Sequence, residues 1–311
     1  MNYSCFEHSF LSKDGKNTVC GRIYVPNEDK VRGVIQLSHG MTDHVGRYER
    51  LAEFFTSHGF VFAGNDHLGH GKSVSDEDDF GFFASSGGTA LLLHDLHAFN
   101  KYLRERFARV PIILMGHSMG SFLARLYANK YPHTVSGVII HGTAGKNSLA
   151  GVGKALIKII KLFKGEKYRS PLVTSMSVGA YRKCFQNENP DTAWLTRDAE
   201  AVKTRTTDKF TSFTFTLSGY YDLFTMLDNC NKKKWYKEYP KQMPTLIMSG
   251  SDDPVGNFGK GPNEVYKQLL ISGCTDVQLK IYDGARHELF NEYGRETVFS
   301  DMLAFAERVI K

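Results

Sequence analysis

A serine with a glycine two residues away on each side is the feature of this sequence with the clearest chemical potential. The run reads Gly116-His117-Ser118-Met119-Gly120. An apolar run, Ile112–Met115, precedes it and predicts a buried strand, while residues 121–130 carry apolar side chains at helical spacing. On a tight strand-to-helix turn, a serine is held in a strained conformation and the two glycines let strand and helix pass closely. We therefore expect Ser118 to be a nucleophile at a helix N-terminus.

A serine hydroxyl needs an adjacent base, and the base needs a buried acid to orient it. On a turn of this kind the acid and then a histidine follow the serine along the chain. The histidines after Ser118 are His133, His141 and His287. His133 lies in a helix-ending turn and is expected at the surface, and His141 ends a strand, where it packs or caps. His287 follows the strand predicted over 277–282, at the sheet edge where active sites of open α/β sheets lie, and is the expected base.

Two adjacent aspartates compete for the role of the acid. The strand predicted over 245–249 runs into Gly250-Ser251-Asp252-Asp253-Pro254. The Gly-x-x-Asp spacing places Asp253 at the apex of the loop, and Pro254 fixes the direction in which the chain leaves it. Asp252 is better suited to capping a turn. We therefore predict that Asp253 orients the base.

Attack by such a serine creates an oxyanion, which needs two backbone N–H donors. The residue after the nucleophile, Met119, supplies one of them. The second donor is expected from the loop after the strand predicted over 34–37. In that loop Gly40 lets the backbone turn, so the N–H of Met41 is the candidate.

The N-terminal half is rich in histidines, which admits a metal site as an alternative. Four of them lie in two loops: His39, His44, His67 and His70. The second loop, Asp66–Ser73, contains two glycines, so its histidines are better explained as residues that fix a turn. We expect no metal ion.

The elements that must position these residues alternate between strand and helix. Strands are predicted over 19–25, 34–37, 60–63, 112–115, 138–140, 245–248 and 277–282. Helices are predicted over 48–57, 91–106, 121–130, 263–271 and 296–310. This alternation predicts an α/β fold whose sheet is mostly parallel and has helices on both faces.

The alternation stops after residue 143 and resumes near residue 244. Residues 144–240 carry 17 Lys and Arg against 9 Asp and Glu, a formal charge of +8, whereas the whole chain carries +6. We interpret this shift as an inserted, mainly helical cap over 144–239. The core domain would then consist of residues 1–143 and 240–311.

One segment of the predicted cap, residues 152–164, is an amphipathic helix. Its apolar face would carry Val152, Leu156, Ile159, Ile160 and Phe163, and its polar face Lys154, Lys158, Lys161 and Lys164. Two interpretations stay open. The apolar face covers the active site, or it meets a membrane or micelle surface while the lysines meet anionic headgroups.

Composition excludes several classes of protein. The chain has 311 residues, 41% of them hydrophobic, which is enough for a sizeable core. Its five cysteines are an odd number and lie far apart in the sequence, which argues against a disulfide framework and against a zinc site. We see neither a signal peptide nor an apolar run of the roughly 20 residues that a membrane span needs, and expect a cytoplasmic protein. No nucleic-acid recognition motif accompanies the positive charge.

Taken together, the motifs resemble the monoacylglycerol lipase and lysophospholipase-like branch of the α/β-hydrolases, the serine-aminopeptidase-type group. The matching runs are His39-Gly40-Met41 with Gly46-Arg47-Tyr48, Asp66–Ser73, Gly116–Gly120, Gly250–Val255 and Gly284–Glu288. The resemblance implies an α/β-hydrolase fold with a cap, no cofactor, and hydrolysis of a carboxylic ester with a medium or long acyl chain. It assigns the nucleophile to Ser118, the acid to Asp253, the base to His287, and the oxyanion donors to Met41 and Met119. The chain departs from the family at Ser121, where a further glycine is frequent.

The leading hypothesis is a serine esterase that cleaves monoacylglycerols or similar lipid esters through an acyl-enzyme. Two alternatives share this scaffold, an aryl or cinnamoyl esterase and a proline-type aminopeptidase. An inactive α/β-hydrolase that serves as a binding module is a third alternative. It is disfavoured because a binding module has no need of a complete serine, histidine and aspartate set.

Overall fold

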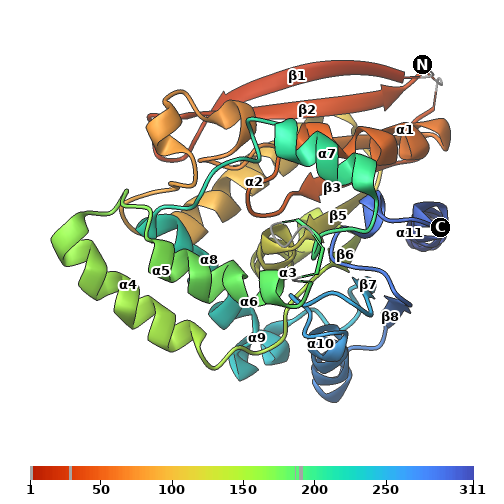
Figure 1. The fold of residues 1–311 in the computed structure, drawn as a ribbon. Coiled ribbons are helices and arrows are strands. Elements are labelled where there is room, and N and C mark those ends of the chain that lie inside the picture. The colour runs from red at the N-terminus through yellow and green to blue at the C-terminus, as the bar shows by residue number, and fades with distance from the viewer. Residues whose placement is uncertain (1–2, 28–29, 186, 189–191) are drawn as a thin grey trace.

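A single eight-stranded sheet forms the centre of the computed structural model, which describes residues 3–27, 30–185, 187–188 and 192–311. The strands are β1 (Tyr3–Leu11), β2 (Thr18–Pro26), β3 (Gly33–Ser38), β4 (Phe60–Asn65), β5 (Ile112–His117), β6 (Gly137–His141), β7 (Thr245–Gly250) and β8 (Val277–Tyr282). Their order is β1-β2-β4-β3-β5-β6-β7-β8, running from the top to the lower right in Figure 1. Only β2 breaks the parallel arrangement, since it is antiparallel to both β1 and β4. The predicted mostly parallel sheet is confirmed.

Helices cover both faces of the sheet, as expected from strands that are apolar on both sides. Every residue of β3 to β7 is buried. On one face lie α1 (Glu49–Ser57) and α11 (Arg295–Val309). The other face is covered by α2 (Gly88–Arg106), α3 (Met119–Lys130) and α10 (Lys260–Ile271). The predicted strands and helices of the core are confirmed, with shifts of a few residues at their ends.

In the described residues between β6 and β7, every regular element is a helix, and loops join the helices. The helices of this segment are α4 (Ala150–Lys164), α5 (Pro171–Thr174), α6 (Ala180–Lys183), α7 (Ala199–Thr207), α8 (Leu217–Cys230) and α9 (Lys233–Glu238), and a turn of π-helix spans Ser175–Gly179. Helix α8 packs against α2, α3 and α4 and so connects this segment to the core. In Figure 1 the segment runs from green to cyan along the left and lower side of the molecule, with α7 above.

A buried arginine of α3 ties two distant parts of this segment to the core. Arg125 is fully buried. Its guanidinium donates to the Ala144 carbonyl oxygen (3.2 Å), just after β6, and to Asn231 Oδ1 (2.9 Å), just after α8. It also donates to the Cys230 carbonyl oxygen and lies 4.6 Å from the ring centroid of Trp235. One side chain therefore holds the start of the segment beside the junction of α8 and α9.

Helix α4 packs on α8 through a narrow seam of small and apolar residues. Ala150, Gly153 and Ile157 are its buried residues. A Cβ atom at Gly153 would lie 2.7 Å from a ring carbon of Phe224, so the two helices approach too closely for a side chain there. Lys154 Nζ, on the predicted polar face, lies 2.7 Å from Asp228 Oδ2 on α8.

The predicted apolar face of α4 mostly faces solvent. Val152 is 58% exposed, Ile159 56% and Phe163 81%, and Leu162 beside them is 82% exposed. No residue of α4 lines the cavity at Ser118. The interpretation that this face covers the active site is therefore wrong, because the helix turns its glycine seam and two of its lysines toward the protein instead.

Candidate active site

Ser118 occupies the turn between β5 and α3 in a strained conformation, with φ 52° and ψ −119°. The turn needs glycine at position 120, because a Cβ atom there would lie 1.9 Å from the Ser38 carbonyl oxygen. The Ser118 N–H donates to the His141 carbonyl oxygen (2.9 Å), and Ser121 Oγ donates to the Ser118 carbonyl oxygen (2.6 Å). The serine at position 121 thus adds a hydrogen bond within the turn.

The structure brings His287 together with Asp253 and not with Asp252. His287 Nδ1 lies 3.0 Å from Asp253 Oδ2, and both side chains are buried. The other oxygen of Asp253 accepts from the Val255 N–H (2.9 Å), which fixes the carboxylate. Asp252 is only half-buried and accepts from Ser251 Oγ (3.1 Å).

The second nitrogen of His287 is left open. His287 Nε2 is buried and has no hydrogen-bond partner among the described residues. The ring centroid of His287 lies 4.8 Å from that of His117, the neighbour of Ser118 in the chain. His133, in contrast, is exposed at the surface, as predicted.

Met41 and Met119 line the same cavity as Ser118. Buried histidines hold the loop that carries Met41: His70 Nε2 accepts from the Thr42 N–H (3.2 Å), and His39 Nε2 accepts from the His67 N–H (2.9 Å). These rings thus fix turns. In the part of the chain that the structure describes, no group of three or more His, Cys, Asp or Glu is arranged to hold a metal ion.

Four buried charges connect the Met41 loop with the loop of His287. Arg47 donates to both oxygens of Glu288 (3.0 and 2.7 Å) and to Asp43 Oδ1 (2.9 Å). Arg205 from α7 adds a contact to Glu288 Oε1 (3.3 Å). Burial raises the pKa of Glu288, but the charge of Arg47 and then that of Arg205 outweigh it and lower this pKa to about 2. Glu288 is therefore ionised in the folded protein at neutral pH.

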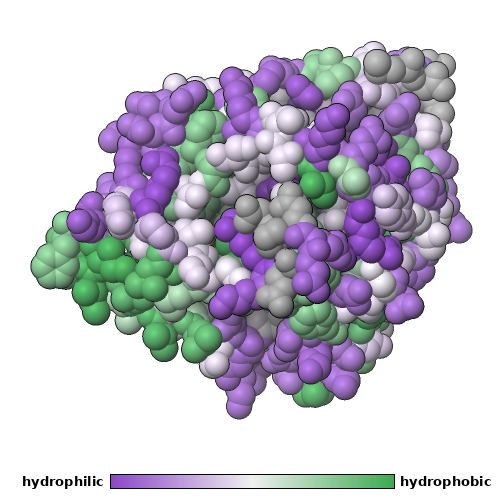
Figure 2. Space-filling model, viewed as in Figure 1, coloured by the Kyte–Doolittle hydropathy of each residue, from purple (hydrophilic) through white to green (hydrophobic). Residues whose placement is uncertain are grey.

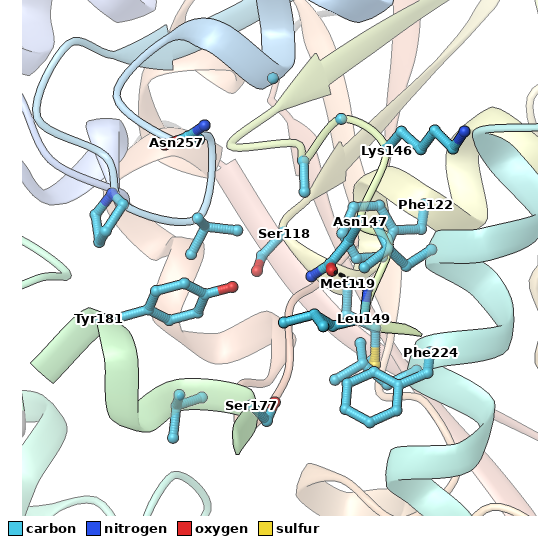
Figure 3. Close-up of a pocket in the computed structure, with 18 of the residues that line it drawn as sticks. Ser118, Met119, Phe122, Lys146, Asn147, Leu149, Ser177, Tyr181, Phe224 and Asn257 are labelled. Carbon is cyan, nitrogen blue, oxygen red and sulfur yellow. Dashed lines mark hydrogen bonds between the residues drawn. The ribbon is translucent and has the colours of Figure 1, made fainter. Parts of the chain in front are cut away.

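A cavity of about 430 Å³ opens at Ser118, within the size range of small-molecule sites. Figure 3 places Ser118 at its centre, between Tyr181 on one side and Met119 and Leu149 on the other. Much of the wall is apolar and comes from α3, α8, the 254–255 loop and the residues around α4 to α6: Phe122, Leu149, Met176, Val178, Leu223, Phe224, Leu227, Pro254 and Val255. The cavity therefore suits an apolar ligand that reaches Ser118.

Two lining residues, Tyr181 and Trp194, were missed by the sequence reasoning. The Tyr181 hydroxyl points toward Ser118 (Figure 3), and burial raises the pKa of this phenol to about 12. The Trp194 ring lies 5.3 Å from the ring of His287. Both residues lie in the segment between β6 and β7, where neither stands in a motif, so no pattern in the sequence points to them.

Comparison with known proteins gives concordant matches over nearly the whole chain. The profile of the family described as Serine aminopeptidase, S33 matches residues 29–294. A monoacylglycerol lipase from Mycolicibacterium smegmatis is 27% identical over 311 residues, covering 96% of this chain and 96% of that protein. The human monoglyceride lipase is 24% identical, with 91% and 83% covered. The structure of a thermostable carboxyl esterase from Bacillus coagulans in complex with glycerol matches with a TM-score of 0.91 at 30% identity, covering 99% of each chain. The predicted fold class is confirmed.

Proposed function

This chain belongs to the serine aminopeptidase S33 family of α/β-hydrolases and is a carboxylic ester hydrolase, and on that premise we propose that it cleaves monoacylglycerols or similar lipid esters at Ser118. The observation that carries the proposal is the buried pair of His287 and Asp253. Nε2 of His287 has no partner among the described residues, and the His287 ring lies 4.8 Å from that of His117, the residue before Ser118. Two of its relatives are named monoacylglycerol lipase and monoglyceride lipase, which supports monoacylglycerols as the substrate class.

The proposed reaction proceeds through an acyl-enzyme. Ser118 Oγ attacks the ester carbonyl carbon while His287 Nε2 takes its proton, and Asp253 stabilises the imidazolium. The N–H groups of Met41 and Met119 donate to the oxyanion. When the C–O bond breaks, the alcohol leaves with the proton from His287. Water, deprotonated by the same nitrogen, then attacks the acyl-enzyme, releases the carboxylic acid and restores Ser118.

The acyl chain is proposed to lie in the apolar cavity. Phe122 of α3 with Leu223 and Leu227 of α8 provide contiguous apolar wall. Each methylene buried there contributes roughly 0.8 kcal/mol, which favours medium and long chains over acetyl esters. Phe122 lies before residue 144, whereas Leu223 and Leu227 lie between residues 144 and 239. Because both parts of the chain form this wall, we propose that residues 144–239 act as a cap domain on the core of residues 1–143 and 240–311.

A fluorophosphonate probe and a set of esters test the proposal. The wild-type protein is expected to react with the probe and to hydrolyse monoacylglycerol and long-chain nitrophenyl esters. Ser118→Ala removes the nucleophile, so labelling should vanish and kcat should fall on the order of a millionfold. A variant that keeps more than a few per cent of the activity would contradict the assignment. An aminoacyl amide, as a peptidase substrate, should not be cleaved.

The exposed face of α4 is proposed to contact a lipid surface. Val152, Ile159, Leu162 and Phe163 are all more than half exposed, and they form part of the apolar patch seen over α4 in Figure 2. Exposed lysines flank this face, so it combines apolar side chains with positive charge, as interfacial helices do. Among the described residues, no helix is long and apolar enough to cross a membrane. We propose a peripheral contact, in which α4 lies at the lipid surface.

Vesicle binding tests this contact separately from catalysis. Leu162→Ser with Phe163→Ser should weaken binding to vesicles that contain phosphatidylglycerol by about tenfold or more, because two apolar side chains no longer insert. Hydrolysis of a dissolved short ester should stay unchanged. Leu11→Ser serves as the control, since Leu11 is 63% exposed on β1, outside the patch. Equal binding by the α4 variant and the control would refute the contact.

A further inference from the structure

His141 makes three hydrogen bonds that connect the two halves of the site. This residue ends β6 and is fully buried. Its carbonyl oxygen accepts from the Ser118 N–H (2.9 Å). Its ring nitrogen Nδ1 lies 2.9 Å from Nδ1 of His117. Its other ring nitrogen, Nε2, accepts from the N–H of Leu289 (3.3 Å), two residues after His287.

These contacts allow a single arrangement of protons on the two rings. The Leu289 N–H can only donate, so Nε2 of His141 must carry a lone pair. Burial lowers the pKa of His141 to about 3, so its ring is neutral and the proton sits on Nδ1. That N–H must then donate to Nδ1 of His117, whose own proton is on Nε2. Burial also lowers the pKa of His117 well below its ordinary value, so His117 stays an acceptor here.

The rings around this pair pack into one cluster. The His117 ring lies between those of His141 (4.6 Å) and His287 (4.8 Å), measured between centroids. Phe290 packs edge-on against His117 (5.0 Å), at the end of the same loop that carries Leu289. A substitution at His141 would therefore change the packing both at the turn of Ser118 and at the loop of His287.

We propose that His141 is a positioning residue that holds the loop of His287 at a fixed distance from the turn of Ser118. This inference rests on the proposed function, in which a proton passes between these two residues. The Leu289 bond fixes the loop on one side, and the His117 bond fixes the ring of His141 itself. Loss of the connection would leave both catalytic side chains present but misaligned, and an error of about 1 Å can reduce turnover a hundredfold.

Two substitutions separate alignment from simple packing. His141→Phe keeps a planar ring but removes both nitrogens, and it should lower kcat by about 10- to 100-fold with KM within about twofold of wild type. His141→Gln places a carbonyl oxygen near the position of Nε2 and can still accept from the Leu289 N–H. It should recover about tenfold of the lost kcat. A His141→Phe enzyme with kcat within about twofold of wild type, or a His141→Gln enzyme as slow as His141→Phe, would overturn the inference.

A control and a spectroscopic measurement make the test independent of folding. His97→Phe should leave kcat unchanged, because His97 on α2 contacts Tyr127 and Tyr131 outside the site. Nitrogen NMR of histidine-labelled wild-type protein should find His141 protonated at Nδ1 and His117 at Nε2, and the opposite pair of tautomers would overturn the inference. Ser118→Ala is measured in the same assay. If Ser118→Ala retains activity, the proposed function fails. If Ser118→Ala is inactive while His141→Phe is fully active, only the positioning role of His141 is refuted.

Discussion

At the scale of single residues, the carboxylate of Asp253 lies 3.0 Å from Nδ1 of His287, and in the proposed mechanism Nε2 of the same ring is the base. Asp253→Asn should offer an amide N–H where a carboxylate oxygen now accepts, and the ring would then take the wrong tautomer. We expect kcat to fall roughly ten-thousandfold. Asp252→Asn is the matched control, because Asp252 is half-buried and contacts Ser251 instead. If the control variant were the more damaged enzyme, the acid would be assigned to the wrong aspartate.

The sequence could predict the site residues that stand in short motifs, but not those that only tertiary contacts bring to the site. Ser118, Asp253 and His287 stand in short runs at the ends of predicted strands, and a parallel sheet brings those ends together. His141 also ends a strand, but its role depends on a bond to Leu289, 148 residues away. Tyr181 enters the site from a helix with no neighbouring motif. Contacts of this kind depend on tertiary packing and leave no local pattern.

At the scale of elements, helix α8 is expected to set the preference for acyl length. Leu223→Ala enlarges the cavity and removes apolar contact, so kcat/KM for long-chain esters should fall by about tenfold or more. Acetyl esters should lose less than about twofold, because they do not reach this wall. Leu172→Ala, at a leucine of α5 that is 55% exposed, should change neither value. Equal losses on short and long esters would mean that Leu223 supports the fold and not the acyl chain.

Helix α4 shows that hydrophobic periodicity can predict a helix without predicting which of its faces packs against the protein. The pattern correctly indicated a helix with an apolar and a lysine-rich face, but not which of them meets the protein. Gly153 decides this, because only a residue without a side chain lets α4 approach Phe224 of α8 so closely. Lys154 and Lys161 then lie toward the protein, where Asp228 and Ser218 accept their hydrogen bonds. The parallel strands posed no such problem, since both of their faces are buried and their runs are continuously apolar.

At the scale of the whole molecule, the charges around Glu288 should make the fold sensitive to acid. The pKa of Glu288 in the folded protein, about 2, lies below its ordinary value of 4.5. Its ionised form therefore stabilises the fold above the ordinary value, and this contribution is lost as the pH falls toward 2. We expect the free energy of unfolding, measured with denaturant, to decrease from about pH 5 to about pH 3.

Glu288→Gln is the variant that isolates this effect. It should be less stable than wild type at neutral pH, because Arg47 and Arg205 lose their shared carboxylate. Its stability should also vary less with pH in the acid range, since one titrating group is gone. An unchanged pH dependence in this variant would mean that other carboxylates, such as Asp43, account for the acid sensitivity.

The position of Arg125 has a consequence for how such a protein can change over generations. Because one guanidinium contacts both Ala144, just after β6, and Asn231, between α8 and α9, these two positions are neighbours in space although they lie 87 positions apart in the sequence. We expect insertions and deletions in the loops between α4 and α8 to leave the contacts of Arg125 in place, because α8 is itself held on α2 and α3. If the proposed function holds, such changes would alter the wall of the cavity and with it the substrate preference, while Ser118, Asp253 and His287 keep their places on the sheet.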